Sequence, residues 1–226
     1  MRLLVIDCAT EACSVALFEN GDALGGAFAM LGRGHAERLI PMIQALPENG
    51  RADRIAVNAG PGSFTGIRVG LAAARALALA WQAQVDGYSS MSLIAAMARA
   101  QYPGQAVDVA ITGGHGEWFF QAFDAAGKAS EPPASHAPKA AAAASRASLV
   151  AGSQAEALAA LRGDCQALPL WPDARAVAAM PLSAFSPDPL PAYGRAPDAQ
   201  LPRAPASLPK SQLAPSPKPR LAPSPP

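Results

Sequence analysis

The sequence has few charged residues, few aromatic residues and an odd number of cysteines. Only 15% of its 226 residues are charged, 6% are aromatic, and the formal net charge is +1. A chain this close to neutrality has no overall electrostatic attraction to nucleic acid or to an acidic membrane surface. Cys8, Cys13 and Cys165 show no CxxC or metal-ligand spacing, so we expect reduced and buried thiols.

Long uninterrupted apolar runs and a secretory leader are also missing. The densest apolar stretch, 69–81, has 13 residues and includes Arg75. A membrane-spanning helix needs about 20 predominantly apolar residues. Met1 and Arg2 lead directly into a strand-like stretch, without the apolar segment of a signal peptide. These absences predict a cytoplasmic protein with no membrane segment.

Proline is scarce in most of the chain and concentrated at its end. Of the 23 prolines, 14 lie between residues 181 and 226. This end of the chain has few large apolar side chains. Their burial would therefore be too small to offset the conformational entropy that ordering costs. The composition therefore predicts a largely disordered, proline-rich tail over 181–226.

The rest of the chain alternates strand-like and helix-like stretches. Strands are predicted at 2–6, 12–18, 24–30, 55–57, 84–86, 107–112, 117–123 and 149–151, and helices at 35–46, 66–81, 90–99 and 154–161. Asn20-Gly21 predicts a hairpin turn because both residues accept positive φ. A new start of strands near residue 107 predicts an α/β fold of two lobes, 1–104 and 105–180, with mixed sheets covered by helices.

Two of the predicted helices have more apolar surface than the rest of a folded domain of this size is expected to cover. In the first, Leu39, Met42 and Ile43 share one face. The second, 66–81, is small or apolar nearly all round, which is typical of a helix buried on both sides. We expect the pair to form an interface with another chain, the alternative being a fully internal helix.

A glycine-rich turn joins a predicted strand to this second helix. The stretch 58–70 reads NAGPGSFTGIRVG. It lacks the lysine of a P-loop, the serine spacing of a nucleophile elbow and the GxGxxG spacing. Backbone N–H groups at such a junction can bind an anion. The alternative is a turn that needs its glycines for positive φ, with Ser63 or Thr65 as the helix cap.

Candidate nucleotide or anion contacts gather at this turn and at the end of the first strand. Asp7 ends that strand and Thr10 lies in the next turn, a position where nucleotide-metal sites often occur. A single carboxylate there can equally serve only to cap a turn. The candidate residues are Asp7, Thr10, Gly60, Gly62, Ser63 and Thr65.

Three stretches of the chain resemble one protein family. IDCATEACSVALFENG, HAERLIPMI and GPGSFTGIRVGLAAARALALA are similar to the TsaB family. TsaB is the partner subunit of the bacterial machinery that makes N6-threonylcarbamoyladenosine (t6A) at adenosine-37 of tRNA. The resemblance covers about residues 1–100, and PAYGRAP at 191–197 is similar to the family's closing P-x-Y-x-R segment.

The resemblance implies an actin-like (ASKHA, ribonuclease H-like) fold with a short second lobe. It also implies a non-catalytic scaffold that pairs with a TsaD-like catalytic subunit through the first two helices of each. A TsaE-like ATPase would complete the assembly, which would contact tRNA as a complex. The implied interface residues are Leu39, Met42, Ile43, Leu71 and Arg75. A homodimer through the same helix face is an open alternative.

The resemblance further implies that this chain has no metal and no catalytic activity of its own. TsaD carries an H-x-x-x-H pair that binds the catalytic metal, and here Ser89 and Leu93 occupy the corresponding positions. No cofactor is implied within the chain, and ATP or ADP is expected only at a subunit junction. The family's I-D-A-R segment reads ITGG at 111–114, which weakens any nucleotide contact from the second lobe.

Two enzymatic alternatives stand beside the scaffold. One is a small stand-alone ATPase that uses Asp7, Thr10 and the glycine turn, although no pattern in the sequence indicates an adenosine pocket. The other is a glycoprotease-like peptidase, which would need a metal pair or a nucleophile elbow that the sequence lacks.

Overall fold

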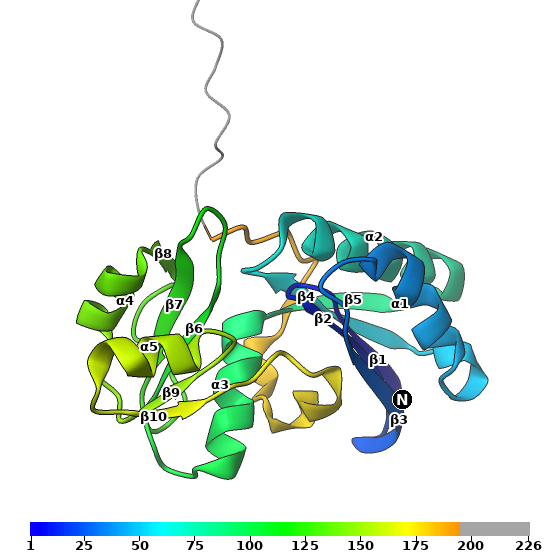
Figure 1. The fold of residues 1–226 in the computed structure, drawn as a ribbon. Helices are drawn as coiled ribbons and strands as arrows, with labels where there is room; N and C mark the ends of the chain where they lie inside the picture. Colours follow the sequence, from blue (N-terminus) through cyan, green and yellow to red (C-terminus); the bar gives the residue numbers. More distant parts are fainter. Residues whose placement is uncertain (195–226) are drawn as a thin grey trace, which may run out of the picture. The chain divides into compact units, whose positions relative to one another are not determined.

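The computed structural model describes residues 1–194, which form two mixed sheets with helices packed around them (Figure 1). The first sheet has the strand order β11-β5-β4-β1-β2-β3, and the second has the order β10-β9-β6-β7-β8. The strands of the first sheet are β1 (Arg2–Asp7), β2 (Ala12–Glu19), β3 (Asp22–Met30), β4 (Arg54–Gly60), β5 (Gln84–Ser89) and β11 (Ser186–Pro187). Those of the second are β6 (Val107–Thr112), β7 (Trp118–Phe123), β8 (Ala134–His136), β9 (Leu149–Ala151) and β10 (Gln166–Leu168).

Five α-helices and three short 3₁₀ segments occur among the described residues. The α-helices are α1 (His35–Gln44), α2 (Phe64–Trp81), α3 (Ser90–Gln101), α4 (Pro138–Ala144) and α5 (Ala155–Arg162). The 3₁₀ segments are η1 (Pro47–Gly50), η2 (Ala174–Ala179) and η3 (Leu182–Ala184).

The two sheets have the same connectivity. In each, three antiparallel strands come first, β1–β3 in one and β6–β8 in the other. A helix, a strand, a helix and a strand follow, and both later strands extend the sheet parallel to its first strand. The restart of strands near residue 107 is therefore a second copy of the first arrangement. The second copy is reduced, because β8, β9 and β10 have three residues each.

Both faces of the first sheet are covered. On one face, α1 and α2 pack onto a core that includes Leu4, Ile6 and Ile55. On the other face, α3 and η2 pack against Val5 and Ala16. Alternate residues of β1 thus point to opposite cores, as the pleat of a buried strand requires.

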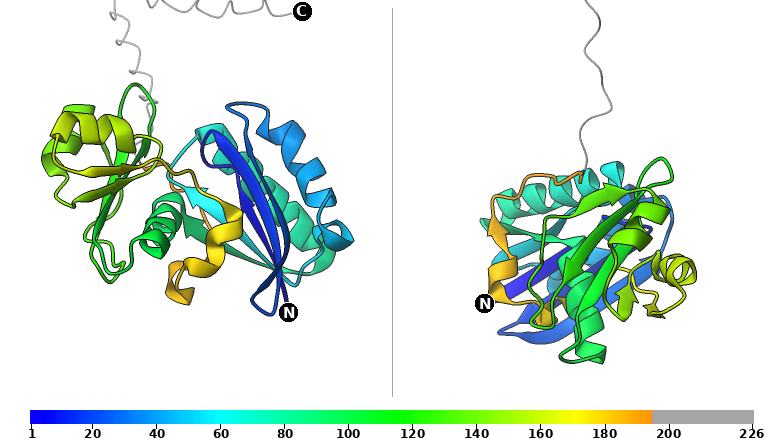
Figure 2. Two further views of the ribbon diagram at one scale, coloured as in Figure 1. Left: turned by 60° about the horizontal axis from the view of Figure 1, so that its bottom comes forward. Right: turned by 90° about the vertical axis from the view of Figure 1, so that its left-hand side faces the viewer.

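Helix α3 lies between the two sheets (Figure 2). Its Leu93 joins the core beside the first sheet, while Met91 and Ile94 join a core with Val107 of the second sheet. All three side chains are buried. A helix apolar on several sides is therefore shared by the two lobes, although it precedes the second lobe in the chain.

Local signals in the sequence account for several element boundaries. Asn20 and Gly21 have positive φ in the β2–β3 turn, the Ser89 hydroxyl caps α3, and Gly163 ends α5 at a φ of 78°. The predicted strands and helices are all present, with ends displaced by a few residues. The sequence did not predict β8, α4 or β10. Their short length leaves no apolar period to detect.

Helix α2 is longer than the apolar stretch noted in the sequence. Among the described residues it is the one helix that could cross a membrane by length and composition, with a mean hydropathy of 1.2 over 18 residues. In the structure it packs on β4 with Ile67, Leu71 and Ala74 buried. Arg68 and Arg75 lie on its exposed side. This is the arrangement of a helix that covers a sheet.

Part of the segment predicted as a tail has a defined place in the structure. Ser186 and Pro187 form β11, which pairs antiparallel with β5 at the edge of the first sheet. Farther on, the backbone N–H of Ala192 donates to the carbonyl of Ala59 at 2.7 Å. The tail boundary at 181 is thus too early, because a proline-rich stretch is tolerated at a sheet edge that needs few of its N–H groups. The rest of the predicted tail, 195–226, lies outside the described residues.

Candidate functional site

The predicted site residue Asp7 meets two polar side chains at the carboxyl ends of neighbouring parallel strands. β1, β4 and β5 lie side by side, so their carboxyl ends share one edge of the sheet. Asn58 Nδ2 donates to Asp7 Oδ2 at 2.6 Å, and the Tyr88 hydroxyl donates to the same oxygen at 2.9 Å. The backbone N–H of Ala9 donates to Oδ1 at 3.2 Å. The carboxylate therefore has a partner from each adjoining segment.

Burial dominates the electrostatics of this carboxylate. Asp7 is fully buried, and this burial raises its pKa from the ordinary 3.8 to about 7, against the lowering effect of hydrogen bonds from Asn58, Ala9 and Tyr88. Burial and the neighbouring Asp7 charge raise the pKa of Tyr88 well above its usual range, so the hydroxyl stays protonated as a donor. Asp7 is enclosed rather than presented to a ligand.

The network continues from Asp7 to the glycine turn. Asn58 Oδ1 accepts from the backbone N–H of Gly60 at 2.8 Å and from the Ser90 hydroxyl at 3.0 Å. The Ser90 hydroxyl also lies 2.8 Å from the carbonyl oxygen of Pro61. Asn58, Tyr88 and Ser90 were not predicted as site residues. The position of Asn58 directly before the AGPG turn is the one signal that could have indicated it.

The glycines of the turn let backbone segments approach one another. A Cβ on Gly62 would lie 2.0 Å from the carbonyl oxygen of Ala9, and one on Gly66 would lie 1.9 Å from that of Cys8. Gly60 has a φ of +111°, and a Cβ there would lie 2.2 Å from the carbonyl oxygen of Ala192. These contacts account for the glycines without a ligand, which is the structural alternative that the sequence left open.

The hydroxyl residues around the turn have local partners. Ser63 is the N-cap of α2, and its hydroxyl accepts from the N–H of Gly66 at 3.2 Å. The Thr10 hydroxyl accepts from the N–H of Ala12 at 3.3 Å, and Thr65 is exposed in the first turn of α2. The structure thus brings all six candidate residues to one edge of the first sheet. Their role as an anion or nucleotide site stays a prediction.

Four of the five predicted interface side chains are internal. Leu39, Met42, Ile43 and Leu71 are at most 6% exposed and belong to the core between the first sheet, α1 and α2. Their prediction as surface contacts is wrong, because the apolar faces of α1 and α2 pack onto the sheet of their own chain. The fifth, Arg75, is exposed, and its Nη2 donates to the carbonyl of Pro189 at 2.8 Å.

Other residues of α1 and α2 are apolar and exposed. Leu79 is 85% exposed, Phe64 is 54% exposed and Ile40 is 39% exposed. Ala72, Ala76 and Ala80 are exposed as well. Ala72, Ala76 and Leu79 follow the spacing i, i+4, i+7 and so share one stripe of α2. We call this set, from Ile40 to Ala80, the outer helix face.

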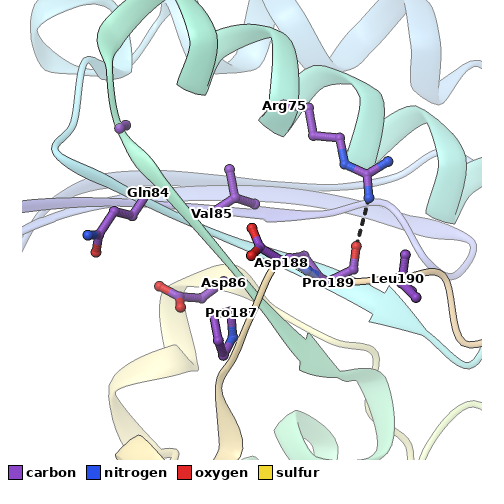
Figure 3. Close-up of a pocket in the computed structure, with 9 residues that line it drawn as sticks. Arg75, Gln84, Val85, Asp86, Pro187, Asp188, Pro189 and Leu190 are labelled. Carbon is purple, nitrogen blue, oxygen red and sulfur yellow. Dashed lines mark hydrogen bonds between the residues drawn. The ribbon is translucent and has the colours of Figure 1, made fainter.

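A shallow hollow of about 530 Å³ lies where residues 187–190 pass β5 and α2 (Figure 3). Its lining residues are Arg75, Ala83, Gln84, Val85, Asp86, Pro187, Asp188, Pro189 and Leu190. Two of its charged groups already have partners. Arg75 holds the Pro189 carbonyl, and Asp86 Oδ2 accepts from Arg54 at 2.5 and 3.1 Å. The Arg75 contact fastens Pro189 to α2, and the backbone N–H of Asp188 donates to the carbonyl of Val85 in β5 at 3.3 Å.

The end of the described chain rests on the start of α2. The Tyr193 ring lies 4.8 Å from that of Phe64, and the Tyr193 hydroxyl accepts from Arg68 Nε at 2.9 Å. The Arg68 guanidinium also lies 3.5 Å from the centre of the Phe64 ring, a cation–π contact. The tyrosine of the P-x-Y-x-R-like segment is thus bound beside the glycine turn.

The comparisons with known proteins agree with this architecture. A family model for TsaD, tRNA N6-adenosine threonylcarbamoyltransferase, matches residues 29–182, which is more than half of the chain. The chain belongs to this family, in its TsaB (YeaZ) group. The TsaB protein of Escherichia coli K12 is 40% identical over 100 residues, covering 42% of this chain and 43% of that protein. The TsaB protein of Haemophilus influenzae is 34% identical over 125 residues, covering 53% and 52%.

Solved structures extend the similarity over most of the described chain. YeaZ from Pseudomonas aeruginosa has a TM-score of 0.67 and 28% identity, covering 79% of this chain and 89% of that one. A Pseudomonas aeruginosa protein described as similar to peptidase YeaZ has a TM-score of 0.69 and 29% identity, covering 86% and 99%. The predicted α/β fold of two lobes, with mixed sheets covered by helices, is confirmed. In sequence, the chain spans about half the length of the curated TsaB relatives it matches.

The two positions where TsaD was expected to carry metal-binding histidines have structural roles in this chain. The Ser89 hydroxyl accepts from the N–H of Met91 at 3.2 Å as the N-cap of α3, and Leu93 is fully buried in the core. Within residues 1–194, no group of three or more His, Cys, Asp or Glu side chains is placed to hold a metal ion. That the protein works without a metal stays a prediction.

Proposed function

We propose that the chain is a non-catalytic scaffold subunit of the t6A machinery. In this role it pairs with a TsaD-like catalytic subunit in the cytoplasm, works beside a TsaE-like ATPase and contacts tRNA as part of the complex. Any ATP or ADP binds at a subunit junction. The proposal is supported by the relatives that are named tRNA threonylcarbamoyladenosine biosynthesis proteins.

The observation that carries the pairing is the outer helix face. Leu79 is 85% exposed and shares a stripe of α2 with the exposed Ala72 and Ala76, and an exposed apolar patch of this kind is typical of a protein–protein contact. Beside Leu79, the exposed Ala72 and Ala76 leave room for a second helix to approach closely. The interface proposed here therefore uses the residues on the outside of α1 and α2. It does not use the buried residues that the sequence pattern had indicated.

The surroundings of Asp7 support a subunit without a reactive centre. A nucleotide–metal site needs a carboxylate that the ion can reach, whereas Asp7 is fully buried under Asn58 and Tyr88. The backbone around Ala9 and Ala192 closes on the glycine turn from two sides. No observation among the described residues favours the ATPase or the peptidase alternative.

The test is co-purification with the TsaD-like protein of the same genome, with molar mass measured by light scattering. We expect a 1:1 complex and no t6A formation by this chain alone. Leu79→Glu should weaken pairing at least about tenfold, because it places a carboxylate in an apolar contact. Leu161→Glu, on the exposed side of α5 in the second lobe, is the matched control and should pair normally.

Each outcome decides a separate part of the proposal. Normal pairing by the Leu79→Glu variant would show that the outer helix face is not the interface. A homodimer of the isolated chain that Leu79→Glu abolishes would show that the face pairs two copies. ATP turnover by the isolated chain would overturn its non-catalytic role.

A further inference from the structure

Two of the three cysteines lie against each other at the end of β1. The Sγ atoms of Cys8 and Cys13 are 3.7 Å apart, and both side chains are buried free thiols. The antiparallel register pairs Asp7 with Ser14, so Cys8 and Cys13 occupy the next pair of opposite positions. Opposite residues of an antiparallel pair have Cα atoms about 4.5–5.5 Å apart. A disulfide spans that distance, so side-chain rotation suffices to bring the sulfurs together.

The environment makes Cys13 the more nucleophilic of the two sulfurs. The hydrogen bond from the Cys8 thiol is the main cause that lowers the pKa of Cys13. Burial and the negative charge of Asp7 oppose it, and the positive charge of Arg38 adds a smaller lowering, so that the net direction is downward. The same hydrogen bond, together with burial, raises the pKa of Cys8. A thiolate beside a second thiol is the arrangement in which oxidation of the first sulfur is resolved by the second.

We propose that Cys8 and Cys13 form a redox modification site, at which hydrogen peroxide converts the two thiols into an intramolecular disulfide. The Cys13 thiolate attacks one peroxide oxygen, the O–O bond breaks, and hydroxide leaves with Cys13 as the sulfenic acid. The Cys8 sulfur then attacks the Cys13 sulfur, an S–S bond forms, and the S–O bond breaks. The departing hydroxides take up the two thiol protons. Two thiols and one peroxide thus give one disulfide and two waters.

The small size of the oxidant fits the burial of the pair. Hydrogen peroxide is little larger than water and reaches a buried site through local opening of the loop that joins β1 to β2. Cys165, in the second lobe, is partly exposed and provides an internal comparison for unassisted oxidation. A bulky thiol reagent should react in the opposite order, with Cys165 first.

The disulfide would stiffen the backbone on which the glycine turn rests. The carbonyl of Ala9 accepts from the N–H of Ser63 at 2.7 Å, and the carbonyl of Cys8 packs against Gly66. Oxidation would thus fix the start of α2, the helix with most of the outer helix face. The proposed redox site at Cys8 and Cys13 does not depend on whether the outer helix face binds a partner.

The experiment uses the full chain with Cys165→Ser, which leaves the pair as the remaining thiols. After treatment with hydrogen peroxide and alkylation, we expect a mass loss of about 2 Da and two unalkylated sulfurs, both reversed by a reducing agent. Cys8 and Cys13 share the tryptic peptide 3–33, so its mass assigns the bond directly. In the variant that also has Cys8→Ser, dimedone should trap the sulfenic acid of Cys13.

Three results would overturn the proposal. One is oxygen addition to peptide 3–33 without the loss of two hydrogens. Another is that Cys8 and Cys13 stay unmodified at a peroxide concentration that is high enough to oxidise Cys165 in the unaltered chain. The third is a disulfide that appears only when circular dichroism shows that the chain has unfolded.

Discussion

Asp7→Asn should change how the stability of the protein depends on pH. The carboxylate is fully buried, and its pKa is raised by burial from 3.8 to about 7. Between these two values the folded chain keeps a proton on Asp7 that the unfolded chain has lost. Stability from this group is therefore fully present below pH 3.8 and declines as the pH rises to 7.

The size of the effect follows from the width of that window. Each pH unit between the unfolded and folded pKa lowers the free energy of unfolding by about 1.4 kcal/mol. Over the whole window the loss is about 4 kcal/mol, a large part of the 5–15 kcal/mol by which a typical domain is stable. The asparagine amide keeps the shape of the carboxyl group and does not titrate. The variant should therefore lack this decline.

The measurement is urea unfolding followed by circular dichroism at several pH values from 4 to 8. The informative quantity is the difference in free energy of unfolding between the unaltered chain and the variant at each pH. We expect this difference to shift in favour of the variant by about 4 kcal/mol from pH 4 to pH 8. Asp22→Asn is the matched control, because Asp22 is an exposed carboxylate in the β2–β3 hairpin.

A constant difference across this pH range would refute the reasoning. It would mean that the hydrogen bonds from Asn58, Tyr88 and Ala9 compensate the burial of the charge. Asp7 would then be ionised throughout, as a charged anchor of the strand ends. A shift equal to that of Asp22→Asn would lead to the same conclusion.

Five further substitutions test the packing around the glycine turn and the helices. Gly66→Ala should destabilise the chain by about 3 kcal/mol in thermal unfolding, because the added Cβ would lie 1.9 Å from the carbonyl oxygen of Cys8. Gly70→Ala in the same helix is the control: its Cβ would make ordinary contacts, so the variant should be as stable as the unaltered chain or more stable. Ser63→Ala should cost about 1 kcal/mol through loss of the α2 cap, measured by urea unfolding. Leu39→Glu should leave little folded chain by circular dichroism, and a folded variant would show that Leu39 is not core. Tyr193→Ala should speed proteolysis after residue 185 without changing the unfolding of the two sheets, since it removes the ring contact with Phe64 and the bond to Arg68.

The outcome for α1 shows what an apolar period does and does not establish. Leu39, Met42 and Ile43 were correctly predicted to share one face of a helix. The sequence does not say what that face contacts, and an excess of apolar surface was expected because the area of the sheet was unknown. The first sheet has six strands, which provide enough surface to bury α1 and most of the inner face of α2.

The polar network around Asp7 had a different reason for escaping prediction. Asp7, Asn58 and Tyr88 are separated by 51 and 30 residues in the chain, and they meet because β1, β4 and β5 are adjacent and parallel. Strand order depends on crossover connections, which a single sequence does not reveal. Cys8 and Cys13 are close in sequence, yet their contact likewise depends on the register of β1 against β2.

The sequence by itself determined the local structure of this protein. Apolar periods placed the longer strands and helices, and Asn20-Gly21 placed the turn between β2 and β3. These features depend on neighbours within a few residues. Tertiary structure alone decided which helix faces are buried, which carbonyls approach Gly62 and Gly66, and how the end of the chain covers the edge of β5. The physical reason is that burial and close packing depend on segments distant in the chain, which only the folded arrangement of the strands brings together.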